Sequence, residues 1–156
     1  MADKSKKIED SENLWDTKII PKKGLLYCFI HKNDVNPDSK EPYPGAFKNT
    51  PRNETGVDLS SDWDKYSTPK KTLERVGKHP KGDGFKNPDD YGVLHLPIEK
   101  IKSNTPSQEL EHNPLQNHEY LPDNQAHTKI IGDKTTKVRE KFMRMFKWEI
   151  LPPDNN

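Results

Sequence analysis

The sequence predicts a small α+β fold with short, mostly antiparallel strands, two main helices and long loops. Two short apolar runs, Leu25–His31 and Tyr91–Pro97, are bounded by glycine, proline or polar residues, as buried strands usually are. The segment 134–147 repeats its apolar side chains at helical spacing. The 14 Pro and 8 Gly, with only 29% hydrophobic residues, indicate a modest core and much loop.

The other elements have weaker signals. Thr68 followed by Pro69 is typical of an N-cap and a first helical residue, so we expect a helix that ends near Val76. Shorter strands, turns or apolar runs are expected at 59–60, 98–102, 108–111, 126–131 and 148–151. We expect residues 1–13 to be a charged tail, 14–152 to form one domain and 153–156 to be a C-terminal tail.

Composition limits the classes of function. The chain has 26 Lys and Arg against 25 Asp and Glu, and this balance favours neither a nucleic-acid nor a membrane binder overall. The single cysteine, Cys28, excludes an internal disulfide and fits a reducing compartment. The N-terminus lacks the apolar core of a signal peptide, and no apolar run approaches the length of a membrane span. We therefore expect a cytoplasmic protein without a membrane segment.

Polar residues at predicted strand ends are the first candidates for a site. His31, Ser60 and His127 lie at or beside such ends, and Arg52 lies on the loop that leads to Ser60. In a catalytic interpretation, Arg52 holds an anion, Ser60 donates a hydrogen bond to it, and a histidine acts as acid or base. In the alternative interpretation, His31 and His127 bond to backbone groups and Arg52 is solvated.

Patterns for metals and cofactors are missing. His112, His118 and His127 have acidic residues between them, but their gaps of six and nine residues match no recognised zinc motif. The chain has no nucleophile elbow and no glycine-rich phosphate loop, and Cys28 lies inside an apolar run where a thiol is usually inert. We therefore predict no metal site and no cofactor.

The last predicted helix carries a row of basic residues. Lys134, Lys137, Lys141 and Arg144 fall on one arc of the helix, beside its apolar arc. Such a row can follow the phosphates of a nucleic acid, and these four residues are the predicted nucleic-acid contacts. A solvated helix face is the alternative.

Several short segments together resemble a set of small bacterial proteins that share a strand ending in Ile-His and an Asn-x-Ala-His motif. The matching segments here are 25–31, 46–51, 59–60, 91–93 and 123–127. The resemblance implies a common fold without an established activity. Asn124, in the last of these segments, is also a predicted ligand-binding residue. Cys28 departs from the pattern, which has Arg at this position. The element order is also loosely similar to ADP-ribosyltransferase-like folds, which would give Glu109 or Glu111 the acidic role.

Two functions stay open. We favour a small binding protein with a protein partner, as an accessory component of a bacterial defence or toxin–antitoxin system, because no catalytic motif is recognisable. The second is an enzyme or sensor that acts on a nucleotide or on nucleic-acid phosphate, through His31, Arg52, Ser60 and His127. The second predicts that these four side chains line one cleft, whereas the first predicts an exposed apolar patch.

Overall fold

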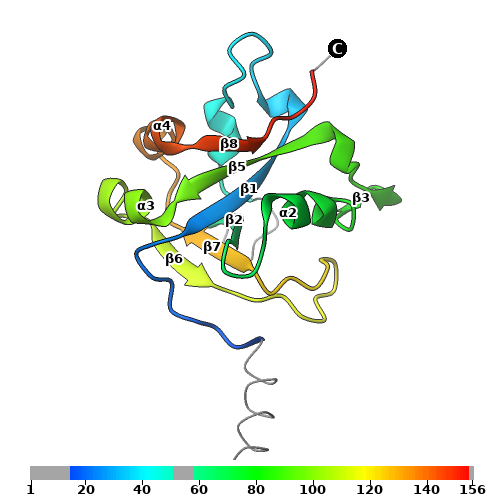
Figure 1. Ribbon diagram of the computed structural model, residues 1–156, viewed down its shortest axis with the longest axis horizontal. Helices are drawn as coiled ribbons and strands as arrows, with labels where there is room; N and C mark the ends of the chain where they lie inside the picture. The colour runs from blue at the N-terminus through cyan, green and yellow to red at the C-terminus, as the bar shows by residue number, and fades with distance from the viewer. Residues whose placement is uncertain (1–14, 51–57, 155–156) are drawn as a thin grey trace, which may run out of the picture.

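A computed structural model of the protein describes residues 15–50 and 58–154. In these ranges the chain forms a six-stranded sheet of order β6-β7-β2-β1-β5-β8, a separate two-stranded hairpin and three α-helices (Figure 1). All the strand pairs are antiparallel. The α+β prediction with mostly antiparallel strands is therefore confirmed.

The sheet is built around its two longest strands. β1 (Leu25–His31) pairs with β5 (Tyr91–Pro97) along its whole length, from Leu25 opposite Pro97 to His31 opposite Tyr91. β2 (Asp58–Trp63) pairs with the other side of β1 and with β7 (His127–Ile131). The edges of the sheet are β6 (Glu109–His112) and β8 (Lys147–Ile150).

One face of the sheet carries the main apolar core. Alternate residues of β1, β5 and β7, such as Leu26, Leu94 and Ile130, pack there against α3 (Ile98–Asn104) and α4 (Thr136–Met145). Phe142 of α4 is fully buried in this layer and meets the ring of Phe47 edge to face at 5.6 Å. Burial of these side chains supplies most of the apolar stabilisation of the fold.

The opposite face of the sheet is covered by α2 (Pro69–Val76) and is much more polar. It carries the side chains that alternate with the core residues, including Tyr27, Ser60 and Asp62. The helix begins as the sequence predicts, because the Thr68 side chain accepts a hydrogen bond from the Lys71 amide and Pro69 is the first helical residue. In Figure 1, α3 and α4 lie together, apart from α2.

The loops hold more regular structure than the sequence predicts. The loop after α2 contains a hairpin of β3 (Pro80–Lys81) and β4 (Gly84–Phe85), followed by a 3-10 turn at Pro88–Asp90. Two further 3-10 turns lie at Lys32–Asp34 and Pro44–Phe47. Residues 1–13, predicted to be a tail, lie outside the described ranges. Within those ranges, no helix has the length and apolar character needed to cross a bilayer.

Close backbone approach at Gly92 gives the first testable prediction. A Cβ at this position would lie 2.5 Å from the carbonyl oxygen of Ile150 and 2.5 Å from the nitrogen of Pro152. The Ile150 carbonyl belongs to β8 and cannot move without disturbing the β5–β8 pairing. Gly92→Ala should therefore lower the free energy of unfolding by about 1–3 kcal/mol. Chemical denaturation measures this change.

Gly84→Ala is the matched control. The added Cβ at Gly84 meets no atom within 4 Å, and this glycine also lies in a strand. Its stability should stay within about 0.5 kcal/mol of the wild type. Equal losses in the two variants would show that the contact at Gly92 is not the cause.

Candidate functional site

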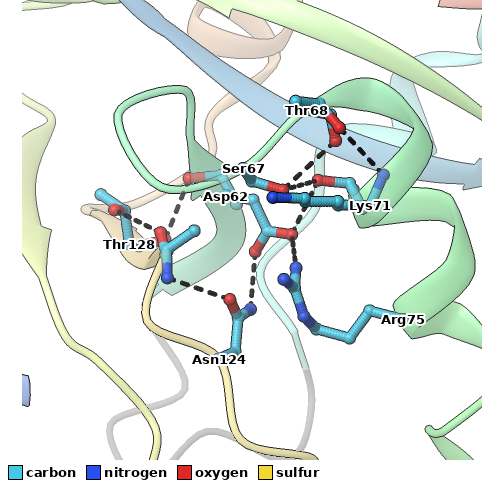
Figure 2. A network of polar contacts seen from close by, with 10 residues as sticks. Asp62, Ser67, Thr68, Lys71, Arg75, Asn124 and Thr128 are labelled. Carbon is cyan, nitrogen blue, oxygen red and sulfur yellow. Dashed lines mark hydrogen bonds and ion pairs between the residues drawn. The ribbon is translucent and has the colours of Figure 1, made fainter.

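The carboxylate of Asp62 is the centre of a polar network between β2 and α2 (Figure 2). Its Oδ2 accepts from the Thr72 hydroxyl at 2.8 Å and from Nη1 of Arg75 at 2.5 Å, and its Oδ1 accepts from the Asn124 amide at 2.7 Å. Ser67 extends the network, because its hydroxyl lies 2.9 Å from that of Thr72. Buried carboxylates need such donors, since an unpaired charge in the interior is very unfavourable.

Asn124 connects this network to the loop that precedes β7. Its side-chain oxygen accepts from the Ala126 amide at 3.0 Å, which fixes the orientation in which its nitrogen faces Asp62. Its backbone pairs with that of Leu115 in both directions. The stem of the loop is therefore closed on itself and held against β2.

Ser60 and His127 form a direct pair on neighbouring strands. Nδ1 of His127 lies 2.8 Å from the Asn113 carbonyl oxygen, which can only accept, so Nδ1 carries the proton of the neutral ring. Nε2 then presents its lone pair to the Ser60 hydroxyl, 3.2 Å away. A hydroxyl next to an oriented imidazole is the arrangement that general-base chemistry uses.

A cavity of about 40 Å³ connects the pair with the network. The polar side chains that line it include Ser60, Asp62, Arg75 and His127. The rest of its wall is mostly aromatic or apolar, with Tyr27, Phe29, Leu115, Leu121 and Pro122. This volume holds about three water molecules, or one head group of a few heavy atoms.

Burial keeps the histidines of this cavity neutral near pH 7. Desolvation is the main cause that lowers the pKa of His127, and the bond to Asn113 and the negative charge of Asp62 oppose it. Desolvation also lowers the pKa of His79, to about 4, assisted by the nearby charge of Lys86. Two neutral imidazoles therefore lie beside the Asp62–Arg75 ion pair.

The structure brings three of the predicted site residues together and separates a fourth. Ser60, His127 and Asn124 all line the cavity. His31 lies on the same face of the sheet but not in the cavity wall: its ring packs on Tyr91 at 4.9 Å, and its Nδ1 accepts from the Asn33 amide. The prediction that His31 shares their cleft is wrong. Arg52 lies outside the described residues.

Of the four basic residues predicted to form a row on the last helix, Lys134 does not belong to that row. α4 begins at Thr136, so Lys134 precedes the helix, and it is only 7% exposed. Its ammonium group donates to Asn49, Ile130 and Gly132 at 2.6–2.9 Å, and burial lowers its pKa to about 8. The prediction that Lys134 belongs to an exposed row is therefore wrong, because this residue ties the end of β7 to the segment before β2.

The histidines once considered as metal ligands have other partners. His112 is 1% exposed, accepts from the Lys18 amide at Nδ1 and donates from Nε2 to the Gln125 carbonyl. His118 accepts from the amides of its own loop. In the described part of the chain, no group of three or more His, Cys, Asp or Glu side chains is placed to hold a metal ion.

Asp62, Thr72, Arg75 and His79 are site residues that the sequence analysis missed. The sequence contained a signal for Asp62. Ser60 and Asp62 are two residues apart, so their side chains lie on the same face of a strand, and that strand is buried on both faces. A buried acid requires donors, and the next helix offers Thr72 and Arg75 at helical spacing.

A scan against protein-family models, a search of curated proteins and a search of solved structures each gave no match. The resemblance to small bacterial proteins stays a prediction.

A second prediction concerns the Asp62 carboxylate. In Asp62→Ala, Arg75 loses its counter-charge and two further donors lose their acceptor, so the free energy of unfolding should fall by roughly 3 kcal/mol. Asp90→Ala removes the more exposed ion pair with Lys32 and should cost less than about 1 kcal/mol. Urea unfolding of both variants tests the difference, and similar losses would contradict a central role for Asp62.

A third prediction concerns pH. The unfolded chain takes up protons at the ordinary histidine pKa of about 6.5, whereas folded His79 takes one up only near pH 4. The unfolded state therefore binds more protons in this window, so stability should fall as the pH is lowered from about 6.5 to 4. His112 and His127, whose pKa values are also lowered, act in the same direction.

Urea unfolding at several pH values between 7 and 4 measures this loss. His79→Gln removes the contribution of His79, so the stability of the variant should change less over the same window. An unchanged pH slope in His79→Gln would contradict this assignment.

Proposed function

We propose that the protein binds a nucleotide through a phosphoryl group that enters the cavity, and that His127 acts there as general base. The observation that carries this proposal is the contact of Ser60 Oγ with Nε2 of His127, in a cavity whose wall also contains Arg75. This proposal is the enzyme or sensor interpretation of the sequence, with Arg75 in the role first assigned to Arg52.

The donors in the cavity support an anionic head group. Arg75 uses only Nη1 in its bond to Asp62, so among the described residues its other guanidinium N–H groups have no assigned acceptor. The Ser60 hydroxyl, which now faces an imidazole, can turn to donate to a phosphoryl oxygen. A planar guanidinium with a neighbouring hydroxyl matches the several oxygens of a phosphoryl group.

The size and the rim of the cavity support a ligand that is only partly enclosed. About 40 Å³ admits a phosphoryl group but not a nucleoside. The aromatic and apolar side chains of Phe29, Leu121 and Pro122 also belong to the wall and give a flat base or a sugar surfaces to pack against. The remainder of the nucleotide would therefore lie at the mouth.

His127 supplies the acid–base chemistry. It is neutral near pH 7, and its tautomer is fixed by the Asn113 carbonyl. Because the one proton of the Ser60 hydroxyl is donated to the phosphoryl oxygen, Nε2 of the neutral imidazole is left to accept the proton of a water molecule beside the phosphoryl group. The water oxygen then bonds to phosphorus while the bond from phosphorus to the leaving oxygen of the nucleotide breaks. The Asp62 charge would stabilise the resulting imidazolium.

A protein partner has less support. Among the described residues, the large exposed apolar side chains come from five separate segments of the sequence: Ile19, Tyr43, Phe85, Tyr120 and Leu151. Ile19 is 92% exposed, whereas its neighbour Ile20 is buried. No residue of the cavity argues for a role in defence or in a toxin–antitoxin system, and both ideas stay predictions.

The test is a thermal-shift screen with nucleoside mono-, di- and triphosphates and inorganic phosphate, followed by calorimetry on any ligand found. A ligand at 100 times its dissociation constant adds about 2.7 kcal/mol of stability, a shift of several degrees. Ser60→Ala should weaken binding about tenfold or more, since a hydrogen bond to a charged group contributes about 1.5–3 kcal/mol. His127→Gln removes the general base, so it should abolish any turnover while changing the affinity less than Ser60→Ala does.

His31→Gln is the matched control, because His31 lies on the same face of the sheet but outside the cavity. Its affinity should equal that of the wild type. A screen without any shift, or equal losses of affinity in His31→Gln and Ser60→Ala, would refute the proposal. Turnover of the bound nucleotide, followed by ³¹P NMR, separates an enzyme from a sensor.

A further inference from the structure

A groove of about 360 Å³ lies between α3 and α4, on the side of the sheet opposite α2. Three of the side chains that line it are basic: Lys100 from α3, and Lys141 and Arg144 from α4. Ser103, Asn104 and Met145 complete the lining. The groove is therefore polar, positively charged and separate from the cavity at Asp62.

No carboxylate of the described residues forms an ion pair with these cations. The ion pairs found there involve Lys32, Lys40, Arg75, His95 and Lys129 instead. Lys141 donates to the carbonyl of Asn104 at 2.8 Å, a neutral partner that leaves its charge uncompensated. The groove therefore presents several positive charges within a Debye length of one another.

Lys137 extends the charge by one helical turn. Lys137, Lys141 and Arg144 follow i, i+4, i+7 spacing, so they share one face of α4 over about 10 Å of helix axis. In one strand of a DNA duplex, phosphates follow at about 3.4 Å along the axis. The row thus spans about three phosphates, and Lys100 adds a fourth positive charge from α3.

We propose that this groove binds the phosphate backbone of a duplex nucleic acid, without reading its sequence. The proposal does not depend on the function proposed for the cavity. It keeps Lys137, Lys141 and Arg144 from the sequence-based prediction, and it replaces the buried Lys134 with Lys100.

The shape and chemistry of the lining favour this partner over other polyanions. A flat bilayer cannot reach into a concave groove, and Met145, the apolar side chain in this lining, is buried and unable to insert into lipid. Single strands usually bind to aromatic side chains that stack on their bases, and this lining has no aromatic residue. Hydroxyl, amide and basic groups are the usual contacts to duplex phosphates.

The experiment is fluorescence anisotropy with a labelled 20-base-pair DNA duplex of mixed sequence, at 50–200 mM KCl. Four contacts predict a slope of about −3 to −4 for the logarithm of the binding constant against that of the salt concentration. Lys100→Gln combined with Arg144→Gln should weaken binding at least tenfold at 50 mM KCl and reduce the slope by about two. Both residues are exposed, so the variant should fold, as circular dichroism would verify.

Lys70→Gln combined with Lys71→Gln is the control, because it removes the same charge from exposed positions on α2. It should bind as the wild type does, and so should Ser60→Ala, which separates this proposal from the one for the cavity. Absence of binding at 50 mM KCl, or equal effects of the two double variants, would overturn the proposal. Stronger binding to a single strand or to phosphatidylserine vesicles would also overturn it, in favour of that partner.

Discussion

The buried carboxylate of Asp62 is the constraint on which the polar half of this structure depends. Its three donors come from two segments that are remote along the chain, α2 and the loop before β7. The free-energy cost of a buried charge without donors is large, so both segments must return to β2 at defined positions. The geometry of the cavity follows, because Arg75 and Asn124 form its walls as a consequence of binding Asp62.

The two faces of the sheet divide stability and chemistry between them. Leu26, Leu94, Ile130 and Phe142 pack with α3 and α4 into the apolar core on one face. That core allows the other face to carry groups that contribute little apolar burial, such as Ser60 and His127. Binding and catalytic side chains are commonly carried by a rigid scaffold in this way, because the scaffold holds the side chains at fixed distances from one another.

The sequence was informative where the signals are local. β1, α2 and β5 have the predicted bounds, because apolar runs and an N-cap are properties of neighbouring residues. Signals that depend on tertiary partners were missed: Lys134 is buried because carbonyls of β7 and Asn49 surround it. Ser60, Asn124 and His127, which the sequence analysis singled out, do line the cavity, but Arg75 and Asp62 become informative only once α2 is known to pack on β2.

Overall charge does not describe the local charge of a surface, for the same reason. A net charge of +1 is a sum over the chain, whereas a ligand responds to the charges within about 10 Å of its own. Arg75 and Lys129 have carboxylate partners, while Lys100 and Arg144 have none among the described residues. A nearly neutral chain can therefore present a positive groove between α3 and α4 and an ion-paired, almost neutral cavity on the other face. The folded arrangement of the charges, rather than their sum, decides which anion each surface can hold.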